Sequence, residues 1–320
     1  MQEVYKNFIG IDIGKNEFVT ATHGSNKTLT FTNAASGWNK FLSKHKKYLE
    51  NCLIVLESTG GYENDLLLFL VKKSISVHRA DTRKIKNFIR SFGKYAKTDA
   101  IDALALAKYA FERNDRLQLF IAPSEDQSEC KLLVERRQDL TKMMVQEKNR
   151  AQAPLNKSLK PDITKLIRFL EKQIQTINDR LKKIIEADKT LKEKKEVISV
   201  IPGLGDVTST TLLAYMPELG QLNRKEIASL AGLAPHPRES GTKTWRRKTI
   251  GGRRSLRPIL FMSSMSASRS HTRLGSFYKS LTDRKKKPII AQVALMRKII
   301  VIANAKIRDY LAEEQSKKMI

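Results

Sequence analysis

Four acidic side chains have the residue types and spacing for metal-dependent chemistry. Asp12 and Glu57 each stand near the C-terminal end of a hydrophobic segment that predicts a strand, where acids are uncommon. Asp99 and Asp102 open an Ala- and Leu-rich run that predicts a helix with both acids on one face. If the strands are neighbours and the helix packs beside them, the four carboxylates converge. Such a cluster repels itself unless cations neutralise it, and its oxygens suit Mg²⁺ or Mn²⁺.

Ordinary structural roles are the alternative for each acid. The two helical acids could cap their helix, the first at the N-cap position and the second three residues later. The two strand acids could face solvent or pair with a lysine. Glu63 and Asp65 lie nearby, but we expect both on the exposed face of the helix that follows the Thr59-Gly60-Gly61 turn. All four acids occur in an order of elements that would bring them together, and this coincidence favours the metal site.

The elements that position these acids form an ordered series. We expect strands over 8–13, 18–22, 28–32, 53–58 and 75–78, and helices over 36–49, 61–71, 82–92 and 99–111. The order β-β-β-α-β-α-β-α-α predicts a mixed sheet flanked by helices. It is the ribonuclease H-like arrangement, which places the strands of Asp12 and Glu57 side by side. We assign this α/β domain to residues 1–115.

The remainder of the chain predicts mainly helices. Residues 125–196 form a charged helix and then a seam of apolar residues at alternating spacings of four and three, which indicates a coiled coil. The seam consists of Ile163, Ile167, Leu170, Ile174, Ile177, Leu181 and Ile184. We expect it to make a dimer; a helical hairpin packed on its own chain is the alternative. Residues 197–320 form a second globular unit, with helices over 256–268 and 288–311.

A basic, turn-rich loop precedes those last helices. Residues 235–241 contain two prolines and a glycine, and cationic residues without an intervening acid follow. Trp245 and Gly251-Gly252 interrupt the charge, which favours phosphate contact and base stacking over a merely solvated face. The predicted nucleic-acid contacts are Lys243, Trp245, Arg246, Arg247, Lys248, Arg253, Arg254 and Arg257.

The overall charge agrees with a polyanionic partner. The chain has 60 Lys and Arg residues against 33 acids, a formal charge of +27. A membrane surface is also anionic, but we find no apolar run near 18 residues and no secretory signal. Cys52 and Cys130 stand in no metal-binding spacing and predict reduced thiols in a cytoplasmic protein associated with the nucleoid.

Several motifs resemble those of a known family. The segments 8–14 (FIGIDIG), 57–61 (ESTGG) and 97–103 (KTDAIDA) resemble the N-terminal domain of the DEDD-type insertion-sequence transposases related to the Piv invertase. That domain resembles the RuvC resolvase fold. The segments 200–205, 230–235, 240–241, 250–253 and 294–298 resemble the family's C-terminal transposase domain. The set covers nearly the whole chain in the family's order.

The resemblance implies specific roles. Asp12, Glu57, Asp99 and Asp102 would bind divalent metal, and Ser240 would attack a DNA phosphate. From the residues alone, Ser240 is not distinguished from Ser255 or Ser209, because no histidine accompanies it. The partners implied are donor and target DNA and a structured bridge RNA that guides the protein to both. A homo-oligomer is implied as well, at least a dimer and a tetramer when two dimers meet on paired DNAs.

Two other functions fit the same sequence. A RuvC-like nuclease would hydrolyse DNA junctions with water, and Ser240 would then be an ordinary loop residue. A non-catalytic architectural protein would use its acids only as caps and surface groups. The charge of +27 fits every one of these functions and discriminates none of them.

Overall fold

The computed structural model describes residues 5–93 and 98–318, and it divides into two compact units, Met1–Ala122 and Pro123–Ile320. Lys97 of the KTDAIDA motif lies outside the described residues. The predicted helical linker of 125–196 and the C-terminal helices belong to one unit, because they share a hydrophobic core.

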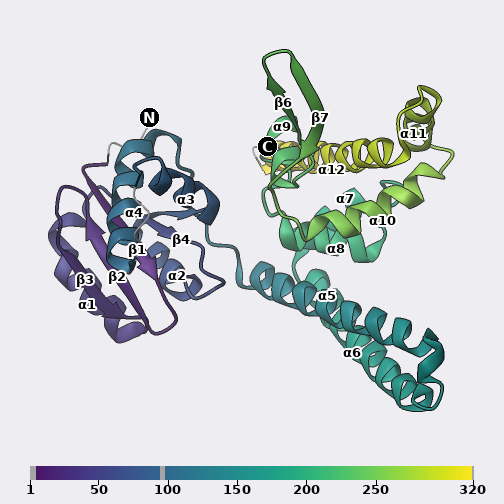
Figure 1. The fold of residues 1–320 in the computed structure, drawn as a ribbon, viewed down its shortest axis with the longest axis horizontal. Helices are drawn as coiled ribbons and strands as arrows, with labels where there is room; N and C mark the ends of the chain where they lie inside the picture. The colour runs from purple at the N-terminus through teal and green to yellow at the C-terminus, as the bar shows by residue number, and fades with distance from the viewer. Residues whose placement is uncertain (1–4, 94–97, 319–320) are drawn as a thin grey trace. The chain divides into compact units, whose positions relative to one another are not determined.

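The first unit contains a five-stranded mixed sheet with the order β3-β2-β1-β4-β5 (Figure 1). β1 pairs antiparallel with β2, and β2 with β3, whereas β1–β4 and β4–β5 are parallel. The predicted mixed sheet is therefore confirmed, with the strands of Asp12 and Glu57 as neighbours. The strands are β1 (Asn7–Ile13), β2 (Glu17–Thr22), β3 (Thr28–Thr32), β4 (Cys52–Glu57) and β5 (Ser76–Ala80).

Helices cover both faces of this sheet. The side chains of Ile9, Ile11 and Ile13 pack in one core with α1 (Ala35–His45) and α2 (Asn64–Lys72). The alternate residues of β1 face α3 and α4, which span Thr82–Arg90 and Asp99–Arg113. Strand alternation in the sequence predicts this division, since successive side chains point to opposite faces.

The second unit is mostly helical. Its α5 and α6 pack together as a helical hairpin, and its C-terminal helices pack around α12 (Figure 1). The structure adds α9 and α11, neither of which the sequence predicted. The helices are α5 (Glu125–Gln152), α6 (Lys160–Ala187), α7 (Lys189–Ser199), α8 (Asp206–Tyr215), α9 (Arg224–Leu230), α10 (Leu256–Ser268), α11 (Arg273–Asp283) and α12 (Pro288–Lys318).

The heptad seam of α6 packs against its own chain. Leu170, Ile177 and Leu181 are buried in one core with Leu133 and Leu140 of α5. The helical-hairpin alternative therefore accounts for the seam. The dimer stays a prediction that these contacts do not test.

Of the described helices, only α12 is long and apolar enough to cross a membrane by length and composition. Its buried residues include Leu295, Ile299 and Ile300, which join the core of the second unit. Two polar side chains of the same helix, Gln292 and Asn304, are buried and hydrogen bonded to neighbouring elements. These contacts are those of a core helix.

The prediction of a turn-rich loop over residues 235–241 is wrong. The chain forms a β-hairpin from β6 (Pro235–Ser240) and β7 (Lys243–Thr249). Gly241, with a φ of +53°, takes the first central position of the two-residue turn, where glycine is favoured. Pro237 is tolerated because β6 has a single partner strand and the pairing is irregular there.

Candidate acidic active site

The register of β1 and β4 brings two of the predicted acids to one edge of the sheet. The strands are parallel with Ile11 opposite Leu56, so the next residues, Asp12 and Glu57, follow one another at the same C-terminal edge. Both acids are two or four residues beyond strand residues that face α4, because Phe8, Leu53 and Val55 share a core with Leu106 of that helix. Asp12 and Glu57 therefore lie on the α4 face.

Helix α4 brings the other two acids to that edge. At the start of β1 the ring of Phe8 lies 5.4 Å from that of Phe111, near the end of α4. Two residues later, Gly10 packs closely against the backbone of α4 at Ala103 and Ala107. The helix thus runs antiparallel to β1, and its first turn, with Asp99 and Asp102, extends over the C-terminal end of the strand.

The N-terminus of α4 does not use its acids as caps in the way considered from the sequence. Thr98 is the N-cap, and its hydroxyl accepts a hydrogen bond from the backbone N–H of Ile101 at 3.2 Å. Asp99 is therefore the first helical residue, and Asp102 lies beyond the capping-box position. Asp102 is 9% exposed and Asp99 is exposed. The capping alternative for these two acids is wrong.

The donor chemistry of this edge fits a hard divalent cation, since all four side chains are carboxylates. Over residues 5–93 and 98–318, however, no three His, Cys, Asp or Glu side chains gather closely enough to hold one ion. In the described structure the four acids therefore lie along one edge and one face of the sheet without forming a compact cluster. A bound cation would offset the mutual repulsion of carboxylates brought together at this edge.

Glu63 occupies a position that sequence reasoning missed. We expected this side chain on an exposed helix face, but it is fully buried and forms an ion pair with Arg79 of β5. It also accepts hydrogen bonds from the backbone N–H groups of Thr59 at 3.2 Å and Gly61 at 2.9 Å. Burial by itself raises the pKa of the Glu63 carboxyl. The hydrogen bonds and the charge of Arg79 outweigh that effect and lower the pKa.

The three candidate serines differ sharply in exposure. Ser240 is the last residue of β6, paired with Lys243 at the tip of the hairpin, and is exposed. Ser209 is fully buried in the second unit, where its hydroxyl donates to the carbonyl of Leu204. Ser255 is half-buried beside Tyr215. Of the three hydroxyls, that of Ser240 is the most accessible to a polymer such as DNA.

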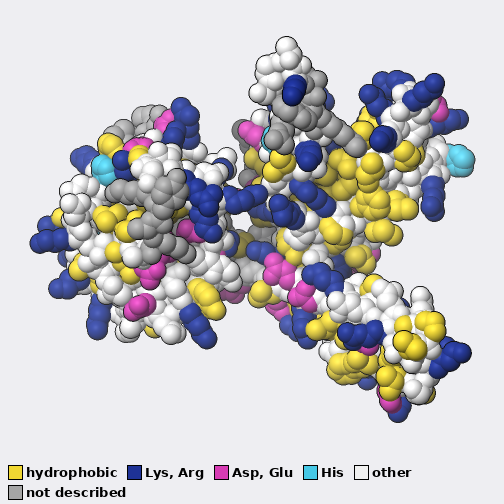
Figure 2. All heavy atoms as spheres, in the orientation of Figure 1, with side chains coloured by type: hydrophobic (Ala, Val, Ile, Leu, Met, Phe, Trp, Pro, Cys, Tyr) yellow, Lys and Arg dark blue, Asp and Glu magenta, His cyan; other side chains and the backbone are white. Residues whose placement is uncertain are grey.

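The predicted nucleic-acid contacts fall into two groups. Lys243, Arg247 and Lys248 are exposed on β7, and Arg254 is exposed after it. The side chains of Trp245 and Arg246 lie outside the part of the chain that the structure describes. Elsewhere, Lys and Arg side chains spread over the visible faces of both units (Figure 2).

Two of the predicted contacts are engaged within the second unit. Arg253 forms a bidentate ion pair with Glu218, with both N–O distances 2.6 Å. Arg257 donates to the carbonyl of Gly251 at 3.0 Å. These guanidinium groups stabilise the base of the hairpin, which lowers their availability for phosphates.

Two glycines allow the chain segments at the base of the hairpin to pack closely together. A Cβ on Gly252 would lie 2.2 Å from the backbone nitrogen of Gly232, and both residues have positive φ. The backbone N–H of Arg253 donates to the carbonyl of Leu230 at 2.8 Å. The two motifs flanking the hairpin, 230–235 and 250–253, therefore interlock, and the hairpin extends from their contact.

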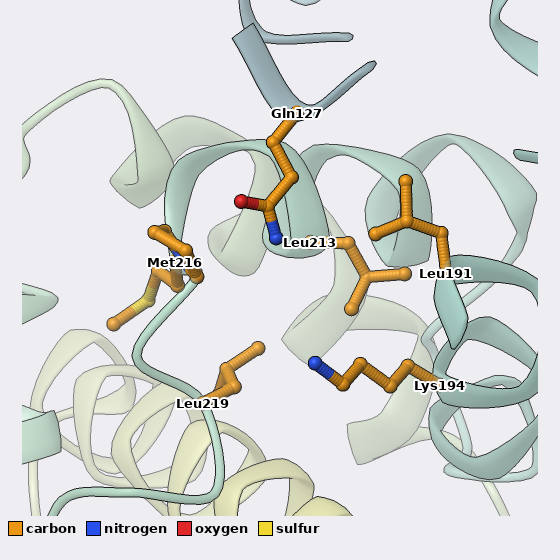
Figure 3. Close-up of a pocket in the computed structure, with 7 residues that line it drawn as sticks. Gln127, Leu191, Lys194, Leu213, Met216 and Leu219 are labelled. Carbon is orange, nitrogen blue, oxygen red and sulfur yellow. The ribbon is translucent and has the colours of Figure 1, made fainter. Parts of the chain in front are cut away.

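A small pocket elsewhere in the second unit has different chemistry. It measures about 210 Å³ with the open space at its mouth. Figure 3 shows the Gln127 amide and the Lys194 ammonium facing it between leucine side chains. Its lining contains none of the predicted catalytic residues: it consists of Gln127, Leu191, Lys194, Leu213, Met216, Pro217 and Leu219.

Comparison with known proteins identifies two family matches. Residues 9–159 match a DEDD-type family of the IS110 group described as "Transposase", and residues 195–279 match "Transposase IS116/IS110/IS902 family". The first match contains the four acids, and the second contains Ser240.

Individual relatives extend this similarity over the chain. A "Pilin gene-inverting protein" of Moraxella lacunata is 28% identical over 313 residues, which cover 95% of this chain and 96% of the relative. Its counterpart in Moraxella bovis is 27% identical with the same coverage. The "Insertion element IS116 uncharacterized 44.8 kDa protein" of Streptomyces clavuligerus is 34% identical over 113 residues, 32% of this chain and 27% of that protein.

Proposed function

Because the chain belongs to the IS110/IS116/IS902 family of DEDD-type transposases, and so is a DNA recombinase, we propose that it cuts and rejoins DNA by metal-assisted phosphoryl transfer. The observation that carries the proposal is that Asp12 and Glu57 follow one another at one edge of the sheet, on the face covered by α4, whose first turn carries Asp99 and Asp102. The strand order and the helix over that edge support a ribonuclease H-like, RuvC-like domain.

Ser240 supplies the nucleophile in this proposal. Its Oγ attacks a DNA phosphorus, the Oγ–P bond forms, and the bond from phosphorus to a deoxyribose oxygen breaks as that oxygen takes up a proton. In the second step a deoxyribose hydroxyl of the other DNA attacks the same phosphorus and releases the serine. Asp12, Glu57, Asp99 and Asp102 would hold Mg²⁺ or Mn²⁺. The bound ion would neutralise charge on the reacting phosphate and activate the hydroxyl.

The hairpin binds the phosphates beside the reacting one. Lys243 is the cross-strand neighbour of Ser240, and Arg247 and Lys248 follow on the same strand. Cations that contact flanking phosphates hold the DNA in register without reading its sequence. The proposal therefore assigns the nucleophile and its DNA contacts to one element.

The remaining partners are an RNA guide and further copies of the chain. The charge of +27 supports a polyanionic partner, and the family resemblance implies that the partners are donor DNA, target DNA and a bridge RNA. Hydrophobic side chains also gather on the α5–α6 hairpin (Figure 2), where Leu155, Leu159 and Phe169 are 96%, 54% and 57% exposed. This surface supports an oligomer of at least two chains, and a tetramer on paired DNAs, through the helical hairpins.

A covalent intermediate tests the proposed mechanism. Purified protein is incubated with Mg²⁺, the RNA of its own element and matching DNA, and the products are separated on a denaturing gel. We expect a protein–DNA adduct in the wild type and in Ser255→Ala, and none in Ser240→Ala or Asp102→Asn. Cleaved DNA without an adduct, formed equally by Ser240→Ala, would identify a hydrolase and refute the serine mechanism. Omitting the RNA tests the guide separately.

A further inference from the structure

A buried carboxylate that takes no part in the proposed chemistry lies next to the acidic edge. Glu63 lies at the start of α2, six residues after Glu57, and none of its surface is exposed. A buried carboxylate requires strong compensation from hydrogen bonds or an opposite charge. Its contacts therefore show what it holds in place.

Those contacts concentrate on the turn that follows Glu57. The Glu63 carboxylate accepts hydrogen bonds from the backbone N–H groups of Thr59 and Gly61 and from the hydroxyls of Ser58 and Thr59. Its ion pair with Arg79 fixes it to β5, the strand next to β4. One side chain thus restrains several residues of the chain immediately after Glu57.

The turn itself needs such support. Gly60 and Gly61 have φ values of +76° and +113°, a backbone conformation with many alternatives for two successive glycines. The Glu63 carboxylate bonds to the residues on both sides of Gly60. Without it, Ser58 would still be held by bonds to the Ala80 carbonyl and from the Thr82 hydroxyl, but the N–H groups of Thr59 and Gly61 would lose the carboxylate that fixes them.

A second side chain ties the same turn to the other acidic strand. The Asn33 amide donates to the carbonyl of Gly14 at 3.1 Å and to that of Tyr62 at 3.0 Å. Its oxygen accepts from the Trp38 ring N–H at 3.0 Å. Gly14 lies two residues after Asp12, so Asn33 connects the chain segments that follow the two strand acids.

We propose that Glu63 is a positioning residue for the metal site: through the Ser58–Gly61 turn it holds Glu57 where its carboxylate can share a cation with Asp12. Asn33 assists from the β1 side. This inference rests on the proposed function, since it requires a cation at the acidic edge. Groups that are hydrogen bonded directly to a metal ligand typically change metal affinity by about 10- to 100-fold. Glu63 acts through the turn instead, so we expect an effect near the lower end of that range.

Metal binding measured without catalysis tests this role. Mn²⁺ is titrated into the full-length protein by calorimetry, and the half-saturating concentration is compared among variants. In Glu63→Gln we expect that concentration to rise about 10-fold, because the turn after Glu57 loses its bonds to the carboxylate. Asp65→Asn is the matched control, because it removes an equal charge from an exposed position on the same helix and leaves binding unchanged.

The outcomes separate this inference from the proposed function. If the wild type binds no Mn²⁺, or if Asp12→Asn binds it equally well, the metal site itself is refuted and this inference falls with it. If the wild type binds and Asp12→Asn does not, equal binding by Glu63→Gln and Asn33→Ala overturns the positioning role alone. Should Glu63→Gln fail to fold by circular dichroism, Asn33→Ala decides. Its bonds to the Gly14 and Tyr62 carbonyls are at the surface, and we expect their loss to weaken Mn²⁺ binding by about 3-fold, less than the loss of the buried carboxylate.

Discussion

Replacing Gly10 by alanine should separate α4 from the sheet. A Cβ at this position would lie 2.2 Å from both the Ala103 carbonyl oxygen and the Ala107 nitrogen, and 2.7 Å from the Leu106 Cβ. Ordinary contact begins near 3.4 Å, so the helix must move away by about 1 Å. Two of the obstacles are backbone atoms of a helix, which cannot turn aside as a side chain can. Overpacking costs about 1–3 kcal/mol, and we expect about 3 kcal/mol here.

The two cysteines provide an assay that distinguishes the units. Cys52 lies in β4 of the first unit and Cys130 in α5 of the second, and both are buried. Burial raises the pKa of the Cys52 thiol to about 12 and that of Cys130 to about 11, so neither reacts readily with a disulfide reagent until its unit opens. A loss of about 3 kcal/mol raises the open population about 100-fold, and labelling of Cys52 in Gly10→Ala should accelerate by that factor.

Labelling of Cys130 in the same variant is the internal control and should keep its wild-type rate. Gly14→Ala, at the residue that follows β1, provides a second control, because its Cβ meets only the Glu17 carbonyl, at 3.2 Å. We expect it to alter labelling of Cys52 by less than about 10-fold, which corresponds to 1.4 kcal/mol. Wild-type labelling of Cys52 in Gly10→Ala would refute the close seating of α4 on β1. The inferred place of Asp99 and Asp102 depends on that seating.

Three further predictions concern the base of the hairpin, its cationic side chains and Glu63. Gly252→Ala places a Cβ 2.2 Å from Gly232 at a φ of +65°, and chemical denaturation should show the second unit destabilised by about 2 kcal/mol or more. Lys248→Gln should reduce the slope of log affinity for DNA against log salt by about 1, whereas Arg253→Gln should mainly lower stability, because Arg253 is paired inside the unit. The lowered pKa of Glu63 stabilises the fold above the unfolded pKa, near 4.5. That contribution disappears as pH falls through the folded pKa, so Glu63→Gln should weaken the acid dependence of stability measured in urea.

The sheet of the first unit was predictable because its signals are local. Alternation in β1 separates Ile9, Ile11 and Ile13 from the residues that face α4, and the structure keeps that separation. The parallel pairing of β1 and β4 follows from the order of elements and needs no knowledge of side-chain contacts. The position of Asp12 and Glu57 at one edge of the sheet could therefore be predicted from the topology alone.

The missed features depend on contacts distant in sequence. Glu63 is buried because Arg79 reaches it from β5, and helical periodicity around Glu63 carries no sign of that strand. The apolar seam of α6 is satisfied by α5, and a heptad pattern does not specify whether its partner belongs to the same chain. In β6 the two prolines suggested a loop, although a single-partner strand accepts them. Gly241 before a Thr- and Trp-containing segment was the available signal for a hairpin turn.

The β6–β7 hairpin combines exposure, charge and the proposed nucleophile in an element with little support of its own. Its two strands pack chiefly on each other, and an isolated two-stranded hairpin is marginally stable in water. Anchoring by Gly232 and Gly252 restrains only its base. We therefore expect DNA to stabilise the tip: amide hydrogens around Ser240 should exchange rapidly in the free protein and at least about 10-fold more slowly with DNA bound, as cationic side chains become fixed on phosphates. The base, at residues 230–233, should change little. Equal exchange at the tip with and without DNA would show that this hairpin does not hold the substrate, and the case for Ser240 as nucleophile would lose its structural basis.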